Sequence, residues 1–170
     1  MPSDTTQQRA GAQATNGDGR HPRERAGSYG LVMGVYAAAT GAFLAWRQAS
    51  GKGLPERFDP QDVVTIGVAT HKTSRLISKD KVASPVRAPF TELEVEGPAE
   101  VAERPTGTGI RRTIGELLAC PYCLDIWLAT SYAAGLVAAP RTTRFLSGAM
   151  SAVAIADFLQ LAYRAGKERS

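Results

Sequence analysis

Residues Ser28–Trp46, SYGLVMGVYAAATGAFLAW, form a run of nineteen residues without a charged side chain. An α-helix rises ~1.5 Å per residue, so the run spans ~28 Å, close to the ~30 Å hydrocarbon core of a bilayer. Tyr29 and Trp46 lie near its two ends, where membrane interfaces favour amphipathic rings. The run predicts a membrane-spanning helix, and its length disfavours the alternative of a buried helix in a soluble protein.

The segment before this run has the opposite character. Residues 1–27 contain no Val, Ile, Leu, Phe, Trp or Tyr and are rich in Gly, Gln, Thr and Arg. Such a composition cannot bury a core, so we expect a disordered polar tail. The apolar run starts far behind this tail and lacks a convincing cleavage site, which favours an uncleaved anchor over a signal peptide.

Three further segments, 60–78, 121–139 and 143–163, are candidate spans. The second span opens with Asp59-Pro60-Gln61-Asp62, in which Asp59 fits the N-cap and Pro60 the first helical position. Its second half is polar, so a helix lying on the membrane surface is the competing interpretation. The last two segments are joined by a very short connection, which predicts antiparallel neighbours.

The polar loop 79–112 separates these segments. Ser84-Pro85 and Ala88-Pro89 disfavour helix over Lys79–Phe90, because proline pushes its predecessor to an extended conformation. Thr91–Arg104 alternates acidic and apolar residues around Gly97-Pro98, which is compatible with a short β-hairpin. Ile110–Ala119 is compatible with a short amphipathic helix. The fold class is thus all-α: a polytopic helical membrane protein with about four membrane helices in residues 28–170.

Positive charge is distributed unevenly along the chain. The net charge is +4, and the Lys and Arg residues lie mainly beside apolar segments. With four spans and a cytoplasmic N-terminus, thirteen of these cations fall in inner segments and five in outer ones. This asymmetry favours a cell-membrane location with both termini in the cytoplasm. No base-reading motif accompanies the basic character, so we do not expect nucleic-acid binding.

A cationic face is the strongest functional clue. Lys72, Arg75 and Lys79 follow the three-and-four spacing of one helical face, with Arg87 nearby. These cations could pair with acidic residues (Asp80, Asp125 or Glu116) as structural glue, hold a lipid headgroup or other phosphate, or simply reach the interface. The predicted cytoplasmic polar cluster comprises Lys72, Arg75, Lys79, Asp80, Arg87 and Glu116.

Cys120-Pro121-Tyr122-Cys123 has the spacing of a dithiol redox motif, and a helix N-terminus stabilises a thiolate. However, no strand–helix alternation precedes the motif, and Asp125 would oppose thiolate formation. The competing interpretation is that Pro121 opens a helix and the thiols stay reduced. Metal binding would draw on His71 and the two cysteines, one ligand short of a tetrahedral zinc shell, so we expect neither a metal nor another cofactor.

Asp157 lies alone within the last candidate span. It could serve as a proton or ion site, but without a second acid in that span a helix–helix hydrogen bond is the better account. The sequence contains no phosphate-cradling glycine loop, Ser/His/Asp signature or paired-carboxylate motif, which favours a non-enzymatic role.

Several blocks of sequence also resemble a bacterial membrane-protein family. They are KTSRLI at 72–77, KDKV at 79–82, SPVRAPF at 84–90, GELL at 115–118, and CPYC at 120–123 with Trp127. Their order is similar to that in the family called domain of unknown function 1360, which includes sporulation-associated members. The resemblance covers about residues 59–160. It implies an integral membrane location and no particular activity.

Together these observations predict a small scaffold, or a module that binds lipid or a partner membrane protein, with its polar cluster at the cytoplasmic face. The bilayer is the expected partner, with an anionic lipid or another membrane protein as further candidates. The rival hypothesis is a membrane thiol–disulfide oxidoreductase that uses Cys120 as nucleophile and Cys123 as resolving thiol.

Overall fold

The computed structural model describes residues 22–97 and 100–168, and most of them are helical. The long helices are α2 (Pro22–Ala49), α3 (Pro60–Ser78), α6 (Pro121–Ala138) and α7 (Pro140–Lys167). The elements between α3 and α6 are η1 (Lys81–Ala83), α4 (Ser84–Arg87), β1 (Thr91–Glu96), β2 (Val101–Pro105) and α5 (Gly109–Ala119). A mostly helical chain with one short hairpin agrees with the prediction.

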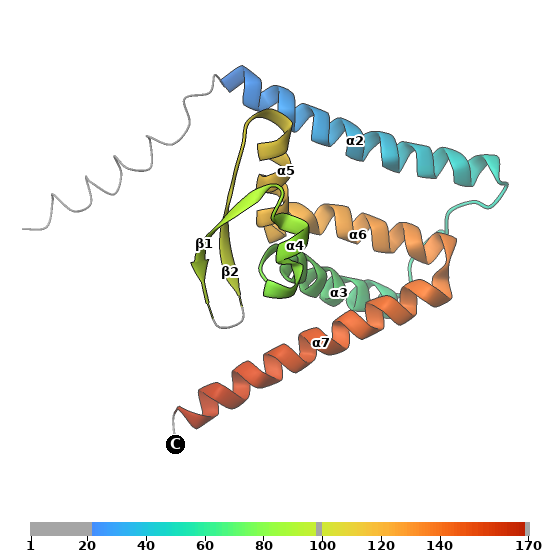
Figure 1. Cartoon of the computed structure of the whole chain (residues 1–170). Helices are drawn as coiled ribbons and strands as arrows, with labels where there is room; N and C mark the ends of the chain where they lie inside the picture. Colours follow the sequence, from blue (N-terminus) through green and yellow to red (C-terminus); the bar gives the residue numbers. More distant parts are fainter. Residues whose placement is uncertain (1–21, 98–99, 169–170) are drawn as a thin grey trace, which may run out of the picture.

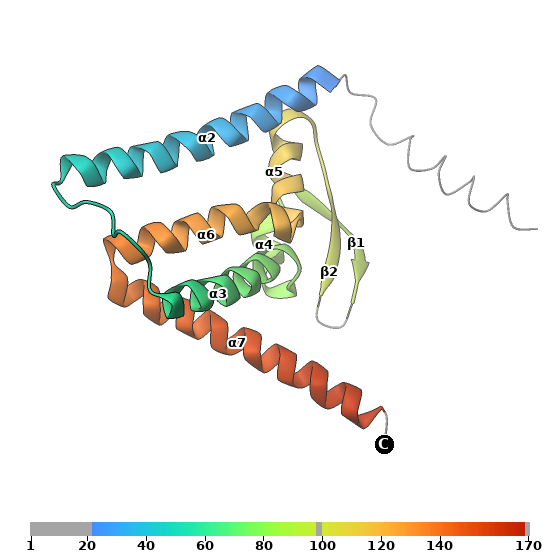
Figure 2. The ribbon, with the colours of Figure 1, turned by 180° about the vertical axis from the view of Figure 1, so that it is seen from behind.

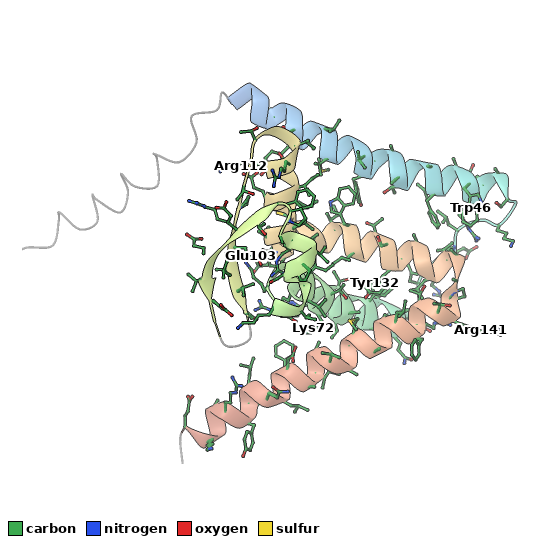
Figure 3. All side chains as sticks on the ribbon, in the orientation of Figure 1. Trp46, Lys72, Glu103, Arg112, Tyr132 and Arg141 are labelled. Atoms are coloured by element: carbon green, nitrogen blue, oxygen red, sulfur yellow. The ribbon has the colours of Figure 1, made fainter. Side chains whose placement is uncertain are left out.

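The four long helices run back and forth between two ends of the molecule (Figure 1). The hairpin end holds β1, β2, α4 and α5, together with the start of α2 and the last turns of α7. The connection end holds the α2–α3 and α6–α7 connections. The reverse view shows the same order, with α6 between α2 and α3 (Figure 2). Figure 3 places Lys72 and Glu103 toward the hairpin end and Trp46 and Arg141 at the connection end.

The start of α3 is capped as the sequence predicts. Asp59 is the N-cap, and its carboxylate accepts a hydrogen bond of 2.8 Å from the backbone N–H of Gln61. Pro60 occupies the first turn, where its missing N–H costs nothing, and Asp62 complements the positive end of the helix dipole. These three residues stabilise the first turn of α3.

Small side chains are buried along both α3 and α7, and one of them joins the two helices directly. Buried small side chains recur at spacings of three or four on both helices: Thr70, Ser74 and Ser78 on α3, and Thr143, Ser147, Ser151 and Ala154 on α7. The Ser151 hydroxyl donates to the backbone carbonyl of Thr65 at 2.8 Å. Small residues let backbones approach closely, which is how membrane helices associate when there is no water to expel.

Two of the described helices are long and apolar enough to cross a membrane: α2 over Ala26–Ala49, and α7. The helices α5 and α6 are bent by 83° at the break between them, and together they would form a third span if the bent pair is taken as a single span. The helix α3 falls outside this group because its second half carries several polar and charged side chains. The spans expected at 28–46 and 143–163 thus lie within suitable helices.

The helix α2 is held mainly by aromatic and hydroxyl contacts. The Tyr36 ring packs edge-on against Trp127 at 5.1 Å, and its hydroxyl lies 2.8 Å from that of Thr130 on α6. Most of its other large apolar side chains, such as Leu31 and Val35, are exposed. A continuous exposed apolar surface of this kind suits hydrocarbon better than water.

The predicted hairpin is confirmed. Strands β1 and β2 pair antiparallel with Glu92 opposite Arg104 and Leu93 opposite Glu103, and a bulge follows Leu93. The hairpin is tied to the end of α3 by the Val101 N–H, which donates to the Lys79 carbonyl at 2.9 Å. The bulge bends β1, which keeps this small two-stranded sheet close to the helices.

Two expectations need correction. Lys79–Phe90 contains a 3₁₀ turn and a one-turn helix, because Ser84 and Ala88, each before a proline, adopt right-handed helical angles. Pro85 tolerates this since it sits in the first turn of α4, where no N–H is required. The first long helix also begins at Pro22 rather than Ser28. The remainder of the predicted tail, residues 1–21, lies outside the described residues.

Candidate functional site

A buried ion pair connects the hairpin to the helices. The side chain of Arg87, on α4, is 0% exposed, and that of Glu103, on β2, is 7% exposed. Arg87 donates from Nε to Glu103 Oε2 at 2.9 Å and from Nη2 to Oε1 at 2.8 Å. This two-pronged geometry matches the planar fork of arginine to the carboxylate and makes the pair specific as well as strong.

The same guanidinium also closes the end of α3. Its Nη1 donates to the carbonyl of Ile77 at 2.5 Å and to that of Asp80 at 3.2 Å. The last carbonyls of a helix have no partner within the helix, so Arg87 supplies donors where the backbone cannot. Thr91 and Ser84 donate to the Glu103 carboxylate from the other side. One arginine therefore binds α3, α4 and β2 into a single unit.

Lys72 forms a second centre of charge between α3 and α7. Its ammonium lies 3.1 Å from Asp80 Oδ2 and 3.0 Å from Asp157 Oδ2, and its side chain is 12% exposed. Two carboxylates around one nearly buried ammonium satisfy a charge that would otherwise be costly beside apolar helices. Asp157, which the sequence left as an isolated acid, thus joins α7 to the end of α3.

Two further ion pairs lie at the molecular surface. Arg75 pairs with Glu100, which precedes β2, and Lys81 pairs with Glu96 at 2.8 Å. The four side chains are all substantially exposed. Exposed pairs of this type contribute about 0–1 kcal/mol each, so their cations can exchange partners at little cost.

These residues surround a groove of about 1000 Å³ between the end of α3, η1, the hairpin and the second half of α7, which we call the charged groove. Its polar lining includes Lys72, Arg75, Asp80, Lys81, Asp157 and Arg164. Its apolar lining includes Val82, Phe158 and Leu161. Figure 1 shows the second half of α7 diverging from α3 toward its C-terminal end, below the hairpin. Charged and apolar surfaces thus meet along one cleft.

The structure brings together part of the predicted polar cluster. Lys72, Arg75 and Asp80 line the charged groove, and Arg87 lies beside it in the buried pair. The helix ends at Ser78, so Lys79 leaves the cationic face, and its side chain forms no ion pair with any residue in the described ranges.

Glu116 belongs to a separate polar contact on α5. It accepts hydrogen bonds from Arg112 at 3.1 Å and from the Tyr29 hydroxyl at 2.5 Å. It therefore faces α2 instead of the cations of α3. Asp80, which was predicted as a partner, pairs with Lys72, but the other three acids that pair with the cluster's cations, Glu100, Glu103 and Asp157, were missed. The alternation of acidic and apolar residues over Thr91–Arg104 could have indicated that Glu100 and Glu103 form ion pairs. The pattern does not show, however, which of these two glutamates points inward.

The cations also change the acidity of two hairpin carboxyls. The Arg87 hydrogen bonds hold the pKa of Glu103 below its ordinary value, outweighing the opposite effect of burial. The exposed Lys81 ammonium likewise lowers the pKa of Glu96. Both carboxylates are therefore ionised at neutral pH.

The two cysteines lie at the break between α5 and α6. Cys120 is the N-cap of α6, and its sulfur accepts a hydrogen bond of 3.3 Å from the Cys123 N–H. The two sulfur atoms are 2.6 Å apart, and both thiols are free. Across residues 22–97 and 100–168, no three His, Cys, Asp or Glu side chains are grouped so that they could hold a metal ion.

Comparison with known proteins places this architecture in a family. The chain is 34% identical over 71 residues to the sporulation protein YjcA of Bacillus subtilis (strain 168), an alignment that covers 39% of this chain and 60% of that relative. No solved structure matches the chain. Residues 65–163, which contain the hairpin, the cysteine pair and the charged groove apart from Arg164, match the family described as "Protein of unknown function (DUF1360)". More than half of the chain is covered by this match, and the protein therefore belongs to the DUF1360 family.

Proposed function

We propose that this protein is a multi-pass membrane scaffold whose charged groove binds the headgroup of an anionic phospholipid at the cytoplasmic face. The observation that carries the proposal is the composition of that groove. Cations from α3, η1 and α7 meet exposed apolar side chains of α7, among them Phe158, which is 59% exposed. A phospholipid has the matching arrangement, since its anionic headgroup adjoins apolar chains.

Four membrane-crossing helices are the arrangement that best supports this function. With α2, α3, α6 and α7 as spans, the hairpin and both described ends lie on one side, as Figure 1 shows. Lys72, the first cation along α3, pairs with Asp80 and Asp157. These ion pairs lower the free-energy cost of placing the polar second half of α3 in the membrane. The excess of Lys and Arg on this side favours the cytoplasm.

Three cations are available to a phosphate. Arg75 and Lys81 are held only in exposed pairs, and Arg164 makes no ion pair with any described residue. A phosphate oxygen can accept charge-assisted hydrogen bonds from such groups, which are about twice as strong as neutral ones. Lys72 and Arg87 are already satisfied, so they hold the groove in shape. The sporulation role named for the relative offers one cellular setting for such a scaffold.

The test is lipid retention by the full chain in nanodiscs of phosphatidylglycerol and phosphatidylcholine, followed by native mass spectrometry after transfer to mild detergent. We expect phosphatidylglycerol to be retained and phosphatidylcholine to be lost. The double variant Lys81→Ala/Arg164→Ala should reduce phosphatidylglycerol retention at least fivefold. Arg141→Ala, an exposed cation at the connection end, serves as the matched control and should have no effect.

Equal retention of the two lipids would remove the basis for an anionic headgroup. Retention that falls equally in the double variant and in the Arg141→Ala control would show a general effect of surface charge, and would also count against the groove. Because neither Lys81 nor Arg164 takes part in the buried pair, both variants should fold.

A second candidate, thiol–disulfide exchange, is favoured by one observation: Cys120 caps α6 with its sulfur beside that of Cys123. In this reaction the Cys120 thiolate would attack a substrate disulfide and release one substrate thiolate. Cys123 would then resolve the mixed disulfide and release the second. A Cys123→Ser variant would accumulate the mixed disulfide with a substrate. An alkylation rate of Cys120 that titrates with an ordinary thiol pKa near ~8.5 would count against catalysis.

A further inference from the structure

The two cysteines form a compact dithiol at the break between α5 and α6, and no residue of these two helices lines the charged groove. Cys120 is half-buried and Cys123 is exposed, so the pair can be reached from solvent. The backbone of Cys120 is extended, with φ −108° and ψ 106°, which leaves its side chain free to cap the first turn of α6. The two sulfur atoms meet at this turn, 2.6 Å apart.

The hydrogen bonds at the dithiol converge on one sulfur atom. Cys120 Sγ accepts a hydrogen bond of 3.3 Å from the backbone N–H of Cys123 and a second one from the Cys123 thiol. Cysteine binds metal ions as a thiolate, and the N–H groups of a helix N-terminus suit that form. The pair is therefore two soft ligands that already face each other across a single hydrogen.

The surroundings of the dithiol add no further ligand. Among the residues that the structure describes, no other His, Asp or Glu side chain joins the cysteines in a group that could hold a metal ion. His71, the third ligand that the sequence offered, stacks on Phe158 of α7 with ring centroids 6.1 Å apart. Glu116, on α5, accepts hydrogen bonds from Arg112. The described part of the chain thus supplies two sulfur ligands and no third.

We propose that Cys120 and Cys123 bind one Cu(I) ion between their sulfur atoms. Zinc takes four ligands in a structural site, and Ca²⁺ and Mg²⁺ require oxygen ligands, so neither class suits an isolated dithiol. Thiolates select Cu(I), a soft monovalent ion that is stable with only two ligands. On binding, the ion takes the place of the hydrogen between the sulfurs. Thiol protons pass to water, both Cu–S bonds form from thiolates, and no electron is transferred.

The dithiol can reach the bound geometry by side-chain movement alone. The two sulfurs must separate to admit an ion between them. Cys123 is exposed, so its side chain can rotate outward, and the three-residue spacing keeps both cysteines on the same face of α6. This site goes beyond the proposed headgroup function. It shares its thiols with the thiol–disulfide exchange candidate but requires no substrate disulfide.

The experiment titrates Cu(I) into the reduced full chain in detergent, with ascorbate and without oxygen, in competition with the chromogenic chelator bicinchoninate. We expect one Cu(I) per chain, with two sulfur ligands in its X-ray absorption spectrum. The chain has only two cysteines, so Cys120→Ser and Cys123→Ser should each weaken binding at least a hundredfold. Serine can still cap α6, and Cys123 is exposed, so both variants should fold.

Met33→Leu is the matched control, because it removes another soft sulfur, exposed on α2, and should leave Cu(I) binding unchanged. Binding that the serine variants do not weaken, or that Met33→Leu weakens equally, would overturn the proposal. Displacement of Cu(I) by an equal amount of Zn²⁺ would do so as well, since further ligands would then be present.

The experiment also separates this site from the two proposed functions. A mixed disulfide trapped in Cys123→Ser, while the native chain binds no Cu(I), would assign the thiols to exchange and overturn the metal site. The Lys81→Ala/Arg164→Ala variant should bind Cu(I) normally, so the metal site and the headgroup site can fail independently.

Discussion

The guanidinium of Arg87 is completely buried and holds Glu103 through two hydrogen bonds, of 2.9 and 2.8 Å, across sixteen positions of the chain. It also donates to two backbone carbonyls at the end of α3. The pair thus determines where the hairpin sits relative to the end of α3. Because the end of α3 lines the charged groove and belongs to this unit, the groove depends on a residue that does not line it.

Removing one partner of this pair should be strongly destabilising. Arg87→Met leaves the Glu103 carboxylate buried without its cation, and we expect a loss of about 3–5 kcal/mol in the free energy of unfolding. Thermal unfolding in detergent, calibrated against denaturant titration, would measure it. Arg104→Ala is the control, because Arg104 is exposed and lies 3.8 Å from Glu92. A loss in Arg87→Met no larger than in this control would contradict the role of the pair.

Replacing both partners should restore much of that loss. In the double variant Arg87→Met/Glu103→Leu no charge is left unpaired, and apolar replacements of buried ion pairs are often neutral. We therefore expect a melting temperature closer to that of the native chain than to that of Arg87→Met. The backbone carbonyls of Ile77 and Asp80 would still lack their donor, so recovery should be incomplete.

The hairpin should loosen at acid pH. The pKa of Glu103 is lowered in the folded state by its hydrogen bonds to Arg87, so the carboxylate contributes stability above its ordinary pKa of 4.5. That contribution is lost as the pH falls through the lowered folded-state pKa. Hydrogen exchange of the hairpin amides should accelerate in this window, after correction for intrinsic exchange rates. In Glu103→Gln the acid-induced part of the change should be much smaller.

Gly115 should not tolerate a side chain. An added Cβ would lie 2.5 Å from the Phe90 carbonyl oxygen and 3.2 Å from the Pro105 Cβ, so α5 would have to move away from the hairpin. We expect Gly115→Ala to cost about 1–3 kcal/mol in the free energy of unfolding. This outweighs the ~1 kcal/mol that alanine adds to helix propensity. Gly148→Ala, with open space around it, should be neutral or stabilising.

The α3–α7 interface should reject large residues. Ser147 is 2% exposed within the row of small side chains on α7, whereas Ala149 faces outward. Ser147→Leu should lower the melting temperature and expose Lys72 as the helices separate, while Ala149→Leu should have little effect. Faster amine labelling of Lys72 in Ser147→Leu would report the separation. An unchanged labelling rate would argue that the interface is not close-packed.

The proposed topology can be tested by labelling. In a background with Cys120→Ser and Cys123→Ser, Lys52→Cys at the connection end should react with an impermeant maleimide on intact cells. Arg104→Cys in the hairpin should react only after lysis. The reverse pattern would place the hairpin outside the cell. The charged groove could then not bind an anionic headgroup of the cytoplasmic leaflet, as we propose.

Several features of the fold could be read from local sequence. The cap at Asp59 and Pro60, the hairpin around Gly97 and the helix at Gly109–Ala119 each depend on a few adjacent residues. By contrast, the helical turn over Ser84–Arg87 was missed, because tertiary contacts override the preference of a residue before proline for an extended conformation. There Arg87 is drawn into the core by Glu103 and by the end of α3, and this holds α4 in its turn.

The candidate site was predicted only in part for the same reason. The cations Lys72 and Arg75 were identified because helical spacing places them on one face. Asp80, close to them in the chain, was also placed in the cluster, but Glu100 and Asp157 lie 25 and 85 positions from Arg75 and Lys72, and helical spacing carries no information about such distances. Glu116 was placed with this cluster, yet its actual partners are Arg112 and Tyr29.

Uncharged runs of membrane length, helix caps and uneven positive charge are local or additive properties, so the amino-acid sequence alone determined that the chain is helical and suited to a bilayer. Which acid neutralises which cation, and which polar atoms are left without a partner, depend on how the helices cross and on which side chains share the space between them. Only the tertiary structure decided those, because ion pairs and hydrogen bonds act over a few ångströms whatever the separation along the chain.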